Sequence, residues 1–387
     1  MRETPMRITP AEIGENLTDI KVIGVGGGGG NALNHMIEEG IQEVEFIAVN
    51  TDAQDLKKNR ADIKIQIGTK LTGGRGTGGD PKKGEESARE SEALIYEKIG
   101  KANMIFITAG MGGGTGTGAS PVIADIAKKN NILTVGVVTI PFKFEGEAKM
   151  NKALNGIESL KKSVNSLIII PNDKVNMLGN GKIPLTQAFK EADSLLTNAV
   201  KGIADIITSV GFMNVDFEDV RTMMSIGGHS IMGMGEGEGE EKVFDAIKRA
   251  VENPLIDDKS IRGARGILVN FTCGEDTTIE EITKGVEYLT KESQTDAEIK
   301  FGVVIDEKYE GRIKATVIAT GLPDKHYKNR EMNVDRGLTV NPPVRETPVA
   351  VSVNPSSSSS IANWGSTPSD FEEPTFKRLK KGNSRIL

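Results

Sequence analysis

In the first half of the chain, short apolar runs alternate with stretches whose apolar residues recur every three or four positions. The short runs predict buried β-strands, and the longer periodic stretches predict amphipathic helices. The predicted strands are 20–25, 45–50, 63–67, 104–109, 133–140 and 167–171, and the predicted helices are 31–39, 81–99 and 120–129. Strands that alternate with helices indicate an α/β fold with a parallel, doubly wound sheet.

The apolar spacing then changes to one long helical pattern, from about residue 185 to 210, which Gly211 would end. A helix of about 26 residues spans roughly 39 Å, long enough to join two domains. Beyond it the pattern predicts strands at 230–234, 266–272, 299–305 and 314–320, with helices at 240–251 and 278–291. We therefore expect a second, smaller α/β domain.

These patterns divide the chain into six parts. Residues 1–19 form an N-terminal extension, 20–184 a nucleotide-binding domain, 185–210 the central helix and 211–322 the smaller domain. Residues 323–369 contain prolines and a run of five serines, and this composition predicts a disordered linker. Residues 370–387 regain aromatic and charged side chains, which favours a short partner-binding peptide over a merely solubilising tail.

Composition narrows the class of protein. The 387 residues carry a net charge of only −6, so nothing in the overall charge indicates a nucleic-acid partner. The single cysteine, Cys273, cannot form an intramolecular disulfide, and we expect a small core residue in a reducing compartment. The sequence has no signal-peptide pattern and no apolar run near 18 residues, so we expect a soluble, cytoplasmic protein that does not insert into a membrane.

Two glycine-rich segments carry the candidate chemistry. The first, 24–31, contains a G-x-G-x-x-G match, and the second, 112–118, reads GGGTGTG. Glycines let backbone N–H groups approach an anion, a following helix N-terminus adds a positive dipole end, and Thr115 and Thr117 supply hydroxyls. No lysine follows, so the second segment is not a Walker A loop. The first segment alone also fits a dinucleotide-binding Rossmann protein, whereas two phosphate-binding segments on neighbouring strands suit a di- or triphosphate.

An acidic segment, 214–219, follows the central helix. Asp216 and Asp219 either present carboxylates on one face or cap the next helix. Transfer of a phosphoryl group to water requires a group that orients the water. These aspartates lie about 20 residues, or roughly 30 Å by helix rise, beyond the nucleotide-proximal part of the central helix, too far to reach their own nucleotide. A second subunit stacked head-to-tail would bring them to it, and such contacts produce a filament.

Taken together, these segments resemble the tubulin/FtsZ family, which includes the bacterial cell-division GTPases. The resemblance runs from about residue 20 to 322. It rests on GVGGGGGN at 24–31, NTD at 50–52, GGGTGTG at 112–118, PFKFEG at 141–146, PND at 171–173 and NVDFED at 214–219. Residues 373–378 are similar to the family's C-terminal binding motif. The competing interpretations are an NAD-dependent Rossmann enzyme and a tubulin-like scaffold that does not hydrolyse nucleotide.

The resemblance implies a GTPase that polymerises head-to-tail into the cytokinetic ring at mid-cell, with GTP or GDP and Mg²⁺ as cofactors. It also implies membrane-tethering and regulatory partners that bind the C-terminal peptide. The metal ligands remain open. The residues implied to hold the phosphates are Gly27, Gly28, Gly29, Gly30, Asn31, Gly112, Gly113, Gly114, Thr115, Gly116, Thr117 and Gly118.

The resemblance also assigns the remaining contacts. Glu145 would contact the ribose, with Lys149 where the family usually has arginine. Phe189 would pack against the base, and Asp193 would accept hydrogen bonds from the guanine N–H groups. Asn214, Asp216 and Asp219 would complete the hydrolytic site of the next subunit.

Overall fold

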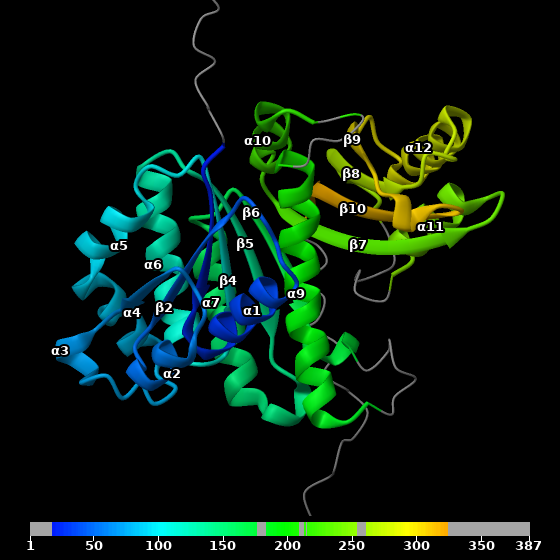
Figure 1. Cartoon of the computed structure of the whole chain (residues 1–387). Coiled ribbons are helices and arrows are strands. Elements are labelled where there is room, and N and C mark those ends of the chain that lie inside the picture. The colour runs from blue at the N-terminus through cyan, green and yellow to red at the C-terminus, as the bar shows by residue number, and fades with distance from the viewer. Residues whose placement is uncertain (1–17, 176–182, 209–212, 214, 254–260, 324–387) are drawn as a thin grey trace, which may run out of the picture. The chain divides into compact units, whose positions relative to one another are not determined.

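The computed structural model describes residues 18–175, 183–208, 213, 215–253 and 261–323 (Figure 1). All of these residues belong to one compact unit. Several parts of the chain lie outside the described residues: the first 17 residues, Gly211, Asn214, the predicted linker apart from Pro323, and the predicted partner-binding peptide 370–387. No helix of the described part is long and apolar enough to cross a membrane.

The described strands form one ten-stranded sheet with the order β3-β2-β1-β4-β5-β6-β7-β10-β8-β9. The strands are β1 Ile20–Val25, β2 Glu45–Asn50, β3 Ile63–Gln66, β4 Met104–Gly110, β5 Leu133–Ile140, β6 Ser166–Pro171, β7 His229–Glu238, β8 Gly266–Cys273, β9 Glu298–Ile305 and β10 Arg312–Leu322. Every strand that the sequence predicts is present. β7 runs four residues further than predicted, through Gly235 and Gly237, because the missing side chains let a helix backbone pack directly on the strand.

The helices cover both faces of the sheet (Figure 1). Their bounds are α1 Gly26–Glu38, α2 Ala53–Lys58, α3 Thr69–Thr72, α4 Pro81–Glu90, α5 Glu92–Ile99, α6 Thr115–Lys129, α7 Glu147–Lys161, α9 Leu185–Thr208, α10 Phe217–Ser225, α11 Lys242–Val251 and α12 Ile279–Ser293. The prediction of one helix over 81–99 was wrong, because the chain turns at Ser91 between α4 and α5. The helices α1 and α6 begin about five residues earlier than predicted, inside the glycine-rich segments.

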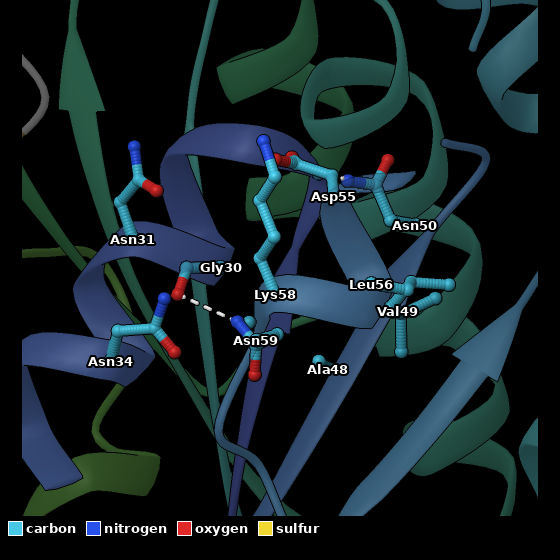
Figure 2. A pocket seen from close by; sticks show the side chains of 12 residues that line it. Gly30, Asn31, Asn34, Ala48, Val49, Asn50, Asp55, Leu56, Lys58 and Asn59 are labelled. Carbon is cyan, nitrogen blue, oxygen red and sulfur yellow. Dashed lines mark hydrogen bonds between the residues drawn. The ribbon is translucent and has the colours of Figure 1, made fainter. Parts of the chain in front are cut away.

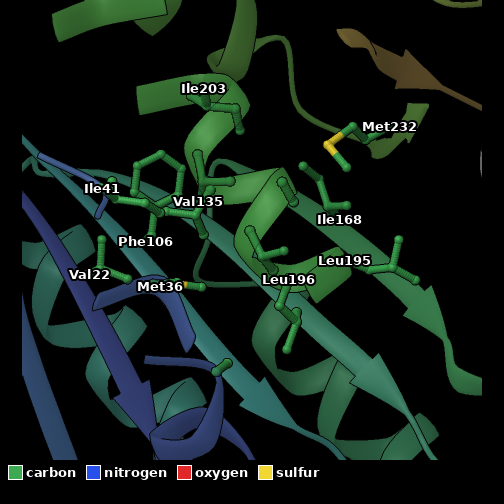
Figure 3. Close-up of a cluster of buried hydrophobic side chains, with 14 of the residues drawn as sticks. Val22, Met36, Ile41, Phe106, Val135, Ile168, Leu195, Leu196, Ile203 and Met232 are labelled. Carbon is green, nitrogen blue, oxygen red and sulfur yellow. The ribbon is translucent and has the colours of Figure 1, made fainter. Parts of the chain in front are cut away.

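Two apolar clusters lie against opposite faces of the first six strands. One packs α1 and α9 on the sheet, and Figure 3 shows members of this cluster from α9, Leu195, Leu196 and Ile203, together with Phe106 and Val135 of the strands. The other packs α4, α5, α6 and α7 against the opposite face. This two-sided coverage, with all six strands parallel, confirms the predicted doubly wound sheet.

The smaller C-terminal half continues the same sheet. Only two residue pairs join β6 to β7, and one of them is Leu167 with His229. A buried hydrogen bond of 2.8 Å between the hydroxyls of Ser166 and Ser230 reinforces the junction. Strands β7, β10 and β8 are antiparallel, β9 is parallel to β8, and a third apolar cluster packs α11 and α12 on them. Cys273 is fully buried in that cluster, as predicted.

Candidate nucleotide-binding site

The two glycine-rich segments meet at the point where the strand order reverses. The first six strands run in the order 3-2-1-4-5-6, and β1 and β4 lie side by side with Val25 opposite Ala109. In open α/β sheets, ligands bind outside the carboxyl ends of the strands at such a reversal. Helix α1 begins directly after β1, and α6 begins shortly after β4, so both helix N-termini lie at this edge.

Close backbone contacts explain why these segments consist of glycine. A Cβ atom on Gly26, whose φ is +72°, would lie 2.8 Å from the amide nitrogen of Gly116. A Cβ on Gly29 would lie 2.4 Å from the carbonyl oxygen of Thr108. Side chains at these positions would force the two segments apart, so glycine keeps both helix N-termini within reach of one ligand.

The first turns of α1 and α6 have the features of an anion site. In each, no side chain caps the first turn, and no acidic residue lies within that turn. By contrast, the nearby helices α2 and α4 are capped by the carboxylates of Asp52 and Asp80. The first four N–H groups of a helix have no partner within the helix, and its dipole favours negative charge there. Two such ends side by side suit a polyphosphate.

The hydroxyls of the second segment are engaged within the protein. The N–H of Gly112 donates to Thr117 Oγ1 over 2.8 Å, which holds the segment in its turn. The hydroxyls of Thr115 and Thr51 form a buried hydrogen bond of 2.7 Å. Gly113 is the open position, because a Cβ added there would meet no atom within 4 Å. Thr51 was missed as a site residue, although it lies in the NTD motif.

A cavity of about 210 Å³ lies beside α1 (Figure 2). It is lined by the first glycine-rich segment, by the end of β2, and by α2 together with its C-cap Asn59. Asn31, one of the predicted phosphate-binding residues, is part of this lining. Asn59 Nδ2 donates to the carbonyl oxygen of Gly30 over 2.8 Å, and Asn50 Nδ2 donates to Asp55 Oδ2 over 3.0 Å. These asparagines and Asp55 were also missed from the sequence, because their proximity to α1 depends on the pairing of β1 with β2.

The residues that would contact the sugar lie in the turn after β5. Glu145 ends a short 3₁₀ turn, Lys143–Glu145, and its Oε1 accepts a 2.9 Å hydrogen bond from the N–H of Phe142. Its other carboxylate oxygen forms an ion pair with Lys149, one turn later in α7. The structure therefore brings Glu145 and Lys149 together, and the lysine neutralises the carboxylate.

Phe189 and Asp193 lie one turn apart on α9. Phe189 is partly exposed and contacts Phe142 edge-on, with ring centroids 5.2 Å apart. Burial raises the pKa of the Asp193 carboxyl to about 6, and the charge of His35 on α1 opposes that shift. Since α1 also begins within the first glycine-rich segment, Asp193 lies close to the helix that carries that segment.

The acidic segment lies at the other end of α9. Asp216 caps α10, and its Oδ1 accepts a 2.7 Å hydrogen bond from the N–H of Asp219. The carboxylate of Asp219 pairs with Lys300 at 2.9 Å. The 15 residue steps from Asp193 to Thr208 correspond to about 22 Å of helix. The length of α9 therefore separates these aspartates from Asp193 of the same chain.

The geometry defines a doubly wound protein that binds a phosphorylated ligand, but this strand order also occurs in dinucleotide-binding proteins. Comparison with family models decides the class. Residues 19–180 match the model of the Tubulin/FtsZ family, GTPase domain, and residues 228–323 match the model of the FtsZ family, C-terminal domain. The chain is therefore a tubulin-like GTPase, and the NAD-dependent alternative receives no support.

Solved structures agree. The chain is 44% identical to FtsZ from M. jannaschii, solved as an empty dimer, with a TM-score of 0.74 over 79% of this chain and 88% of that one. It is 21% identical to CetZ2 from Haloferax volcanii, solved as a GTPγS-bound protofilament, with a TM-score of 0.70 over 80% of this chain and 96% of that one. At this identity the similarity shows a shared fold alone. The chain belongs to the FtsZ family of filament-forming cell-division GTPases. Because M. jannaschii is an archaeon, the similarity does not indicate a bacterial source.

Proposed function

We propose that this chain assembles head-to-tail and hydrolyses GTP at the contact between two subunits. The observation that carries the proposal is the placement of two sets of residues along α9. Phe189 and Asp193 lie near its start, and Asp193 is close enough to His35 of α1 to feel its charge, whereas Asp216 and Asp219 follow its end. With about 22 Å of helix between the sets, the aspartates act on the nucleotide of a neighbouring subunit. Related proteins assemble in solved structures, M. jannaschii FtsZ as a dimer and CetZ2 as a protofilament.

In this proposal the nucleotide is bound by one subunit. The N–H groups of the two glycine-rich segments hold the phosphates, Glu145 binds the ribose and Phe189 packs against the base. The ionised carboxylate of Asp193 accepts hydrogen bonds from two adjacent N–H donors of guanine, and adenine lacks that pair of donors. Lys149 orients Glu145 through their ion pair. The lysine ammonium is a single point charge, so unlike an arginine it cannot form two parallel hydrogen bonds to one carboxylate.

Mg²⁺ is the proposed metal cofactor. The described residues contain no group of three or more His, Cys, Asp or Glu side chains that could hold a metal ion by themselves. This donor set fits Mg²⁺, which is commonly held by one or two carboxylates together with substrate phosphates and water. Asp55 is the candidate carboxylate, because a Cβ placed on Gly27 would lie only 3.2 Å from its Oδ2. When bound, the ion would neutralise charge on the phosphates.

The aspartates of α10 are proposed to orient the attacking water. Asp216 is at the same time an N-cap, so replacement by alanine confounds capping with catalysis. Asp216→Asn separates the two roles, because asparagine caps a helix about as well as aspartate. We expect Asp216→Asn and Asp219→Asn to bind GTP and assemble with wild-type affinity, and to hydrolyse GTP far more slowly.

The concentration dependence of hydrolysis tests the shared site directly. Phosphate release per subunit should rise steeply at the protein concentration where light scattering first detects polymer, because a lone subunit lacks the second half of the site. Phosphate release per subunit that is the same below and above that concentration would refute the proposal.

We also propose that the segment 370–387 recruits membrane-tethering and regulatory division proteins, and that the filaments work in the cytoplasm as the mid-cell ring. Many weak peptides on one filament would bind a membrane-bound partner by avidity. Removal of residues 370–387 should leave GTP hydrolysis unchanged and abolish ring recruitment in cells that carry a fluorescent fusion. A truncated protein that still forms mid-cell rings would argue against this role.

A further inference from the structure

A lysine from β9 contacts the acidic start of α10. The Nζ atom of Lys300 lies 2.9 Å from Asp219 Oδ1 and 3.5 Å from Glu298 Oε1. About a third of the Lys300 side chain and of the Asp219 side chain is exposed, so both are accessible at the surface. The hydrogen bond to Asp219 is the largest cause of the raised pKa of Lys300. Lys300 is therefore a fixed positive charge beside a proposed hydrolytic carboxylate.

The surroundings of this lysine are strongly acidic. Asp216 caps α10, Glu218 and Asp219 lie in its first turn, and Glu298 lies at the start of β9. Arg221 is engaged elsewhere, because its Nε lies 3.4 Å from Glu218 and its guanidinium lies over the ring of Phe217. Among the ion pairs that the described part of the chain shows, the one that reaches Asp219 comes from Lys300.

This arrangement has an electrostatic consequence at a subunit contact. In the proposed filament, the first turn of α10 approaches the triphosphate of the neighbouring subunit, so carboxylates meet a strongly negative ligand. Like charges repel, and desolvation at an interface increases that repulsion because the local dielectric constant falls. A lysine that stays paired with Asp219 lowers the negative charge at this point and restrains the carboxylate.

We propose that Lys300 is a positioning residue for GTP hydrolysis, which holds the Asp219 carboxylate in place and offsets its repulsion with the nucleotide of the adjacent subunit. The inference rests on the proposed function, because it requires α10 to face another subunit's nucleotide. It adds a basic residue on a different element, β9, to the acidic segment that the sequence singled out. Lys300 acts through Asp219 and need not touch the nucleotide.

The test replaces Lys300 in the full chain with methionine, which keeps the length of the side chain and removes the charge, and with arginine, which keeps the charge. Lys284→Met is the matched control, because it removes an exposed lysine that pairs with Glu280 on α12. Steady-state GTP hydrolysis and pelleted polymer are measured over a series of KCl concentrations, and monomer affinity for GDP is measured by fluorescence.

The expected result is selective. At low salt, Lys300→Met should lower kcat per polymerised subunit about three- to fivefold, the size expected from an exposed ion pair, with GDP affinity unchanged. The deficit should shrink as KCl rises, because salt screens both the ion pair and the repulsion that it offsets. Lys300→Arg and Lys284→Met should behave as wild type. In the Asp219→Asn background, Lys300→Met should lower kcat little further, because Lys300 acts through the Asp219 carboxylate that is already missing.

Two outcomes would overturn the inference. One is wild-type kcat for Lys300→Met at low salt. The other is a deficit that is independent of salt, is not restored in Lys300→Arg and accompanies a lower Tm, which would make the ion pair merely structural. These outcomes are distinct from failure of the proposed function, because in that case Asp219→Asn itself would hydrolyse GTP at the wild-type rate.

Discussion

The pKa of Asp193 predicts that guanine nucleotide affinity depends on pH. Burial raises the pKa of this carboxyl to about 6 in the nucleotide-free protein. The guanine N–H donors require the ionised form, so the favourable interaction is present above this pKa and is lost as the pH falls through it. A group with a pKa of about 6 is roughly 97% ionised at pH 7.5 and about 9% ionised at pH 5, so affinity should fall about tenfold between these values.

The stability of the nucleotide-free protein should respond with the opposite sign. The folded-state pKa of Asp193 lies above 3.8, the ordinary value of an aspartic acid, so the folded protein holds this proton more tightly than the unfolded chain does. The ionised carboxylate therefore costs stability at pH 7, and this cost is relieved as the pH falls through about 6. Asp193→Asn should remove both effects, giving a nucleotide-free protein that gains less stability than wild type on acidification.

The assay is a fluorescence titration with a labelled GDP analogue at pH 5, 6, 7 and 7.5, below the polymerisation threshold. Asp205→Asn is the matched control, because burial also raises the pKa of Asp205 on the same helix, where the charges of Lys201 and Lys314 oppose the shift. The wild type and Asp205→Asn should lose affinity in acid, and Asp193→Asn should bind weakly at every pH. A tenfold acid loss that persists in Asp193→Asn would refute the reasoning.

Three further changes probe the packing that builds the site. Gly118→Ala should lower the free energy of unfolding in urea by about 2–3 kcal/mol, because the added Cβ would lie 1.9 Å from a backbone oxygen of α4. Gly113→Ala is the control and should unfold as the wild type does, because a Cβ at that position would meet no atom within 4 Å. Thr51→Val should cost about 1–3 kcal/mol because it leaves the Thr115 hydroxyl without its buried partner, and equal Tm values for variant and wild type would contradict this. Asp216→Ala should lower stability by about 1 kcal/mol through loss of the N-cap, and Asp216→Asn should not, so equal destabilisation by both would argue against capping.

Much of the fold can be predicted from local pattern. A strand buried on both faces of a parallel sheet is a continuous apolar run, so β1, β2 and β5 begin and end where the sequence indicates. The starts of α1 and α6 could not be predicted in this way, because glycine has low helix propensity and a glycine run is typical of a loop. Close contact with neighbouring backbone outweighs that preference, and the contact is visible only in the folded chain.

The sequence by itself determined the alternation of strands and helices, the two glycine-rich segments and the acidic segment after α9, because each depends on residues close together in the chain. Only the tertiary structure decided which distant side chains meet. The hydroxyl of Thr51 reaches Thr115, His35 lies near enough to influence Asp193, and Lys300 pairs with Asp219. These contacts depend on strand order and helix packing, which bring together elements dozens of residues apart, and no local periodicity encodes them.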